Sequence, residues 1–103
     1  MISRGYVQAG GLQVHYRTAG ARRPGRLPVV LLHQTASSSV MFEGVMGLLA
    51  SEAYLFAPDT PGFGGTDALA ERGSIAGYAA VLRAALDRME IDRCLLFGHH
   101  SGA

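Results

Sequence analysis

The chain has 103 residues, a net charge of +1 at pH 7, and 49% hydrophobic against 17% charged residues. This length allows one domain, and the apolar content excludes a disordered polyelectrolyte. The balanced charge favours neither a nucleic-acid partner nor an anionic membrane, and the single cysteine, Cys94, excludes an internal disulfide framework.

The first residues lack the apolar run of a signal peptide, and no stretch approaches the roughly 18 apolar residues of a membrane span. We therefore expect a cytoplasmic protein with neither a membrane nor a nucleic-acid partner. The four histidines are scattered and lack metal-ligand spacing, so the sequence predicts no metal and no cofactor.

Two short extended patterns open the chain, at residues 6–8 and 12–17. In the second, apolar residues alternate with polar ones, as in a strand buried on one face, and the polar set is Gln13, His15 and Arg17. This alternation predicts that His15 faces solvent. Gly10-Gly11 between the patterns allows a tight turn, so we expect an antiparallel hairpin.

The next segment, residues 18–28, is a loop with Arg22, Arg23 and Arg26 among glycines and prolines. A basic loop of this composition is typical of solvated surface. A binding site for phosphate or an acidic partner is the other interpretation.

Apolar strand-like segments then alternate with helical patterns. Residues 29–32 are apolar at every position, as expected for a parallel strand covered on both faces, and residues 54–57 and 94–97 are similar. A serine among residues 37–39 predicts the N-cap of a helix over about 40–50, and Ser74 predicts the cap of a longer one. The order indicates an α/β fold in which an antiparallel entry hairpin precedes parallel strands joined by crossover helices.

The last apolar strand runs into Gly98-His99-His100-Ser101-Gly102. This matches the spacing of a nucleophile elbow, in which residues two before and two after a strained central residue must be nearly free of side chain. With His100 at the centre, Gly98 and Gly102 take those places. With Ser101 at the centre, an imidazole would stand where there is no room for one, so the glycines favour His100.

At this point the sequence resembles the α/β-hydrolase superfamily over its whole length. The resemblance rests on the entry hairpin, the strand end Leu31-Leu32-His33, the loop Asp59-Thr60-Pro61-Gly62-Phe63-Gly64 and the elbow, which follow that family's order. It implies a mostly parallel sheet, a nucleophile at the elbow, and an acid and a histidine later in the chain.

The resemblance also implies site residues. The oxyanion hole would be formed by the backbone amides of Thr35 and Ser101, with His33 bracing the oxyanion loop by hydrogen bonds. Two positions depart from the family pattern: His100 stands where Ser, Asp or Cys is usual, and Gln34 replaces a glycine. An ordinary strand-to-helix loop is the other interpretation of residues 34 and 35.

Two functions follow from these residues as alternatives. The first is hydrolysis of a small ester, amide or lactone-like acyl compound, with His100 attacking as a nucleophile or activating water. The second is a non-catalytic binding protein that keeps the fold and a pocket for a small molecule.

The expected domain is an incomplete α/β-hydrolase domain over residues 1–103, ending at the elbow. The superfamily's acid and histidine fall outside this sequence, so we expect the fragment alone to be inactive. The strand at residues 94–97 would also leave an open hydrogen-bonding edge beside uncovered apolar surface.

Overall fold

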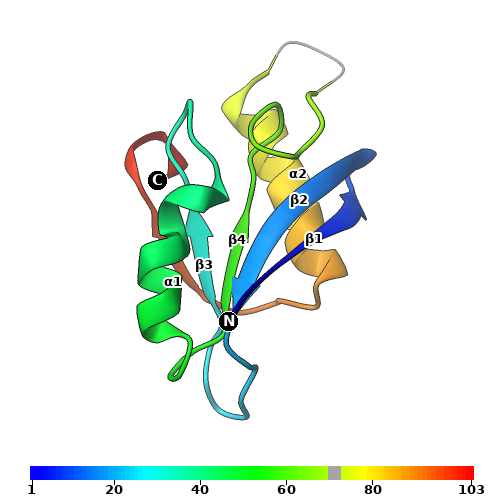
Figure 1. The fold of residues 1–103 in the computed structure, drawn as a ribbon. Helices are drawn as coiled ribbons and strands as arrows, with labels where there is room; N and C mark the ends of the chain where they lie inside the picture. The colour runs from blue at the N-terminus through cyan, green and yellow to red at the C-terminus, as the bar shows by residue number, and fades with distance from the viewer. Residues whose placement is uncertain (70–72) are drawn as a thin grey trace.

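The computed structural model describes residues 1–69 and 73–103, which form one mixed five-stranded sheet in the order β1-β2-β4-β3-β5 (Figure 1). The strands are β1 (Ile2–Ala9), β2 (Leu12–Ala19), β3 (Val29–Leu32), β4 (Leu55–Pro58) and β5 (Leu95–Gly98). β1 pairs with β2 and β2 with β4 in antiparallel fashion, whereas β3 runs parallel to β4 and to β5. The predicted α/β fold with an antiparallel entry hairpin is confirmed.

Both predicted helices form, and each starts at a serine cap. The Ser38 hydroxyl accepts from the Val40 amide at 3.3 Å, where η1 (Ser39–Phe42) leads into α1 (Glu43–Leu49). The Ser74 hydroxyl accepts from the Gly77 amide at 3.0 Å at the start of α2 (Ile75–Arg88). These caps satisfy amides that have no partner within the helix. Across residues 1–69 and 73–103, no helix is long and apolar enough to span a membrane.

The two helices cover opposite faces of the sheet and so bury it in three layers (Figure 1). On one face, Phe42 and Met46 from η1 and α1 join a cluster with the strand residues Ala19, Leu31, Leu55 and Ala57. On the other face, Val81 and Ala85 of α2 pack against Ala9 and Val14. A neighbouring cluster on that face contains Val30, Phe56 and Ile91. Side chains of β3 and β4 therefore reach both faces, as their unbroken apolar runs predicted.

The expectation that His15 faces solvent is wrong. His15 is 2% exposed and Arg17 is 9% exposed, although both lie at the polar positions of the alternating pattern in β2. β2 is an inner strand, and the polar face of this segment is covered by the loop after β4 and by η1 and α1. The covering groups are polar and form hydrogen bonds with both side chains. The alternation of apolar and polar residues therefore could not indicate that this face is buried.

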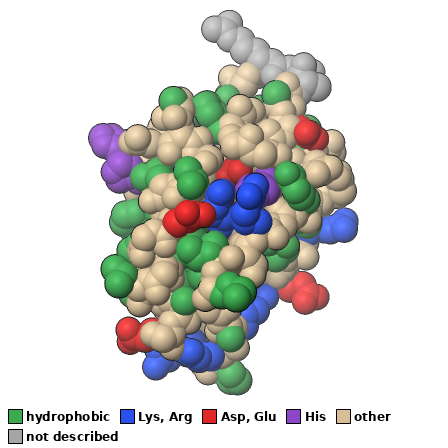
Figure 2. Space-filling view, viewed as in Figure 1, with side chains coloured by type: hydrophobic (Ala, Val, Ile, Leu, Met, Phe, Trp, Pro, Cys, Tyr) green, Lys and Arg blue, Asp and Glu red, His purple; other side chains and the backbone are tan. Residues whose placement is uncertain are grey.

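β5 ends the sheet, and its large side chains are open to solvent. Leu95, Leu96 and Phe97 are 58%, 64% and 52% exposed, and within the described chain β5 pairs with β3 alone. The expected open edge beside apolar surface is therefore present. Further apolar side chains are exposed on α1, including Leu48, on the side of the molecule where Figure 2 shows green atoms over this helix.

Two phenylalanines of parallel strands allow a matched test of this burial. Phe56 is fully buried in the centre of the sheet, so Phe56→Ala should lower the free energy of unfolding by about 3–5 kcal/mol. Phe97→Ala removes the same atoms from a half-exposed site and should cost less than about 1.5 kcal/mol. Urea denaturation measures both, and equal losses would contradict the assignment of β5 to an uncovered edge.

Candidate functional site

The three parallel strands end at the same edge of the sheet and bring together the residues that follow them, which include the predicted site residues His33 and His100. His33 follows β3, Asp59 follows β4, and His99 and His100 follow β5. The β3–β5 register aligns Leu32 with Gly98, so the two loops that follow leave the sheet side by side. The carboxyl edge of a parallel sheet is where α/β proteins commonly place ligands.

A tight turn follows β5, and His100 is its strained residue. His100 has φ = 51°, in the left-handed region that non-glycine residues rarely adopt, and it begins the single turn η2 (His100–Gly102). A Cβ on Gly98 would lie 2.5 Å from the carbonyl oxygen of Gly102, and one on Gly102 would collide with the carbonyl oxygen of Leu32. Both glycines are therefore required by close backbone approach, as the spacing predicted.

The loop after β3 and the turn after β5 are joined by hydrogen bonds. The Thr35 amide donates to the Ser101 hydroxyl at 2.6 Å, and the Thr35 hydroxyl lies 2.6 Å from the same oxygen. The two residues whose amides were expected to form the oxyanion hole are thus adjacent, joined through the side chain of Ser101. The Ser101 hydroxyl oxygen now occupies the hydrogen-bonding position that an acceptor from a ligand would take on the Thr35 amide.

His33 holds the loop after β3 against the loop after β4. Its Nε2 accepts from the Thr60 amide at 2.9 Å, which places the ring proton on Nδ1. Nδ1 donates to the carbonyl oxygen of Gln34 at 2.7 Å. The buried ring thus links Thr60 to the backbone that precedes Thr35, and these are the contacts expected of a bracing residue.

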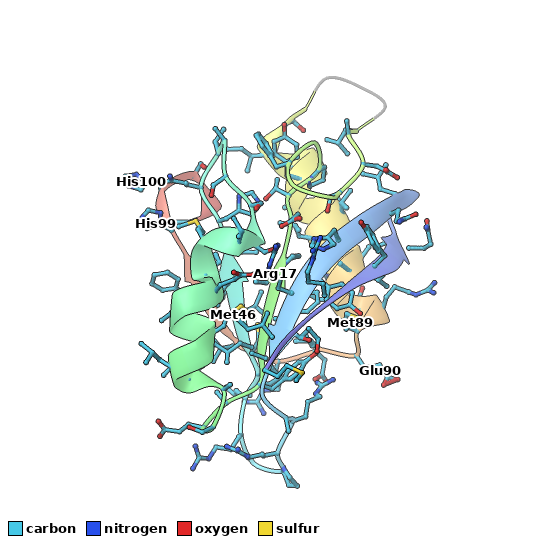
Figure 3. All side chains as sticks on the ribbon, viewed as in Figure 1. Arg17, Met46, Met89, Glu90, His99 and His100 are labelled. Atoms are coloured by element: carbon cyan, nitrogen blue, oxygen red, sulfur yellow. The ribbon has the colours of Figure 1, made fainter. Side chains whose placement is uncertain are left out.

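A cavity of about 500 Å³ opens beside these loops, between the sheet and α2. Its lining combines polar residues with apolar ones: His33, Thr35, Thr60, Arg83 and Ser101 are polar, and Val30, Leu82, Leu86 and Leu96 are apolar. His100 does not line it. The rings of His99 and His100 pack edge to face with centroids 4.5 Å apart, and Figure 3 shows both residues at the outer side of the molecule. His100 is exposed.

In the described part of the chain, no three His, Cys, Asp or Glu side chains gather as they would around a metal ion. The polar groups that line the cavity are hydroxyls, one imidazole and the guanidinium of Arg83, and they suit hydrogen bonding to an oxygen of a ligand. The arrangement can orient a small molecule that has a carbonyl or hydroxyl group next to an apolar body.

Sequence reasoning missed the most highly connected polar residue near the site, Asp59. Its side chain is completely buried at the end of β4. The carboxylate accepts from the Ser39 amide at 2.7 Å, the Gly65 amide at 2.9 Å and His15 Nδ1 at 2.8 Å. A carboxylate directly after an apolar strand, followed by a glycine-rich segment, was the available signal.

The hydrogen bonds to Asp59 keep it ionised. Burial would raise the pKa of this carboxyl, but hydrogen bonds from the Ser39 side chain, the Gly65 and Ser39 amides and the His15 ring outweigh burial. They hold the pKa below its ordinary value of 3.8. The network extends through Ser39, whose hydroxyl accepts from Arg17 at 2.7 Å, and Arg17 also donates to Glu43 at 2.9 Å.

The partners of His15 define its protonation state. Asp59 is an ionised carboxylate and only accepts, so Nδ1 of His15 carries a proton. Arg4 only donates, and its Nε lies 3.1 Å from Nε2, so that nitrogen is the acceptor. His15 is therefore a neutral imidazole with both nitrogens engaged, which connects β1 and β2 to the carboxyl end of β4.

Comparison with known proteins identifies relatives of this arrangement. Residues 28–103 match the family model described as the alpha/beta hydrolase fold. An uncharacterized hydrolase of Saccharomyces cerevisiae is 46% identical over 57 residues, covering 55% of this chain and 19% of the yeast protein. An uncharacterized protein of Mycobacterium tuberculosis is 32% identical over 95 residues, covering 86% of this chain and 28% of its own length.

Two solved structures are similar over nearly the whole chain. The epoxide hydrolase CorEH superimposes with a TM-score of 0.89 at 26% identity, covering 99% of this chain and 35% of its own. The haloalkane dehalogenase DbeA of Bradyrhizobium elkani gives a TM-score of 0.87 at 26% identity, covering 96% of this chain and 33% of its own. The chain thus spans about a fifth to a third of the length of these proteins.

The close approach at Gly102 predicts a specific sensitivity. Gly102→Ala should lower the free energy of unfolding by about 1–3 kcal/mol, because the new methyl group would collide with the backbone of β3. Gly44→Ala is the matched control, since its Cβ would meet nothing within 4 Å, and it should stabilise α1 by about 0.5–1 kcal/mol. Thermal denaturation followed by circular dichroism compares the two, and a neutral Gly102→Ala would contradict the tight turn.

The buried carboxylate predicts a pH dependence of stability. Because the folded-state pKa of Asp59 is lower than its unfolded value, its stabilising contribution is complete above about pH 4 and is lost as the pH falls through the folded-state pKa. Asp59→Asn should therefore reduce the loss of unfolding free energy as the pH falls below about 4, and it should lower stability at neutral pH. Asp67→Asn, at an exposed carboxylate that accepts one amide hydrogen bond, should leave the fall in unfolding free energy at acid pH unchanged. Denaturant titrations from pH 2 to 7 test this, and an unchanged slope in Asp59→Asn would refute it.

Proposed function

Because the chain belongs to the alpha/beta hydrolase fold family, we propose that it provides the nucleophile elbow and the oxyanion loop of a hydrolase. The substrate class we propose is a small ester, amide or lactone-like acyl compound. The names of the similar solved structures, an epoxide hydrolase and a haloalkane dehalogenase, support hydrolytic chemistry on small molecules in this fold.

The observation that carries the proposal is the junction of the two loops at the carboxyl edge of the sheet. The Thr35 amide donates to Ser101 at 2.6 Å, directly beside the strained residue His100. Backbone amides fixed in this way can receive the negative charge that develops on a carbonyl oxygen during acyl transfer. The His33 hydrogen bonds keep the first of these amides in place without reorganisation.

The proposed reaction uses His100 as the attacking group. A neutral ring nitrogen forms a bond to the carbonyl carbon, the bond to the leaving oxygen or nitrogen breaks, and the leaving group takes the other ring proton. Water then cleaves the acyl-imidazole, which yields the acid and restores the neutral ring. In the alternative role, the same nitrogen takes a proton from the attacking water as general base.

For the 103 residues alone we propose no efficient turnover. In the described structure, the imidazole of His100 forms no hydrogen bond to an acid that would orient it. The buried pair His15–Asp59 is fully engaged elsewhere. An exposed imidazole without such a hydrogen bond is not held in a reactive orientation, and fixed orientation is a large part of the rate enhancement that catalytic residues provide.

The second candidate function is binding without catalysis. The exposure of His100 and its absence from the cavity lining favour this alternative, because a ligand could contact Thr35 and Ser101 without meeting the imidazole. Both functions place the oxygen of the ligand on the Thr35 amide, and they differ in the part played by His100.

The shared oxygen position can be tested by titrating the protein with a small aliphatic ketone, which mimics the ester carbonyl but cannot be hydrolysed. We expect the Thr35 and Ser101 amide signals in nuclear magnetic resonance spectra to shift most. Ser101→Ala should tighten binding several-fold, because it removes the hydroxyl that competes for the Thr35 amide. Ser51→Ala, at an exposed serine, should change nothing. Shifts confined to other amides would overturn the proposed site.

The catalytic step is tested with an activated ester. The 103-residue chain should hydrolyse it no faster than its His100→Ala variant, with His99→Ala as the control for a neighbouring imidazole. Rapid turnover that His100→Ala abolishes and His99→Ala preserves would show that these residues suffice for catalysis, contrary to the proposal of an inactive fragment.

A further inference from the structure

A second pocket lies at the end of the sheet opposite to His100. It has a volume of about 440 Å³ and is formed by the loop between β2 and β3 and by the segment that precedes β5. We propose that this pocket binds a compact, soluble ligand that carries several phosphate groups. The proposal is independent of the proposed hydrolase site, since the two lie at opposite ends of the parallel strands.

Positive charge is more concentrated in this pocket than in the chain as a whole. Among the described residues the pocket is lined by Arg22, Arg23, Arg26 and Arg93 and by one acidic residue, Asp92. The whole chain has 9 basic and 8 acidic residues, so nearly half of its positive side chains meet at this place. Figure 2 shows blue atoms gathered at the lower end of the molecule, over the loop that Figure 1 draws between β2 and β3. Such a concentration attracts multiply charged anions.

Two of the arginines are held by backbone carbonyls that follow helices. Arg22 donates to the Met89 and Glu90 carbonyls at 3.1 and 2.8 Å, and its guanidinium lies 5.6 Å from the centroid of the Tyr54 ring. Arg23 donates to the Ser51 carbonyl at 2.6 Å. These contacts fix the side chains at the ends of α1 and α2, so less conformational entropy is lost when a ligand is bound.

The anchoring leaves donors for a ligand. A guanidinium has five N–H groups, and the contacts of Arg22 and Arg23 use only some of these donors. Arg26 has one long contact of 3.5 Å to the Glu52 carbonyl, and Arg93 makes no hydrogen bond to another described residue. Two arginines are therefore free to close on an anion, and two are pre-positioned beside them.

The lining favours phosphate over other ligands. Leu27 and Pro28 are its largest apolar members, so the pocket offers no platform for an aromatic or aliphatic body. Guanidinium forks match phosphate oxygens in bidentate geometry, and several forks in one small pocket suit an anion with several charges. The volume accommodates a compact group such as a di- or triphosphate.

Calorimetric titration of the 103-residue protein with inorganic tripolyphosphate at physiological ionic strength tests the proposal. Arg93→Gln should weaken binding by about tenfold or more, because it removes a charge-assisted donor without disturbing a hydrogen bond of the folded chain. Arg26→Gln combined with Arg93→Gln should abolish measurable binding. Arg88→Gln is the charge-matched control: this exposed arginine lies in the last turn of α2, lines neither pocket, and should change affinity less than twofold when substituted.

The other outcomes overturn the proposal. Absence of binding by the unsubstituted protein excludes the site, and equal losses in Arg93→Gln and Arg88→Gln would show a general attraction between charges. Vesicles of phosphatidylcholine with and without a phosphoinositide form a separate arm. Binding to phosphoinositide vesicles without binding to tripolyphosphate would assign the arginines to a membrane surface and exclude a soluble ligand.

Discussion

The arrangement of the whole carboxyl edge of the sheet depends on one buried carboxylate. Asp59 ends β4 and accepts hydrogen bonds from residues of β2, of η1 and of the glycine-rich loop, which are distant from one another in sequence. An ionised group in this position is tolerated only because every partner is in place, since a buried charge without hydrogen bonds costs several kcal/mol. The network therefore couples the entry hairpin to the parallel strands more specifically than apolar packing does.

The candidate site is built on this frame through backbone contacts. Thr60, the residue after Asp59, donates to His33, and His33 holds the carbonyl of Gln34 next to Thr35. A continuous series of covalent and hydrogen bonds thus leads from the buried carboxylate to the amide that we propose as an oxyanion donor. On the other side, the turn at His100 approaches β3 so closely that only glycine fits at residue 102. Precise placement of backbone donors at this edge follows from both constraints.

The two ends of the sheet differ in chemistry. The carboxyl end places hydroxyls, an imidazole and Arg83 around a partly apolar cavity, whereas the amino end gathers four arginines, two of them anchored on the carbonyls that follow α1 and α2. Strand direction explains the division, because in a parallel sheet the loops that follow strands and the loops that precede them lie at opposite edges. A neutral acyl compound and a compact polyanion could therefore be held by one small chain without competing.

The sequence by itself determined the order of strands and helices along the chain, the serine caps and the turn at His100. These depend on local signals: apolar runs, capping side chains, and glycines at fixed spacing. Only the tertiary structure decided the position of His15 and Arg17, because the groups that bury them lie 22 to 44 residues away and are polar. It likewise revealed that Asp59 is the centre of a network, that Ser101 rather than His100 lines the cavity, and that Arg93 joins the arginines of a distant loop. Contacts between remote polar side chains leave no periodic trace in a sequence, so they appear only when the chain is folded.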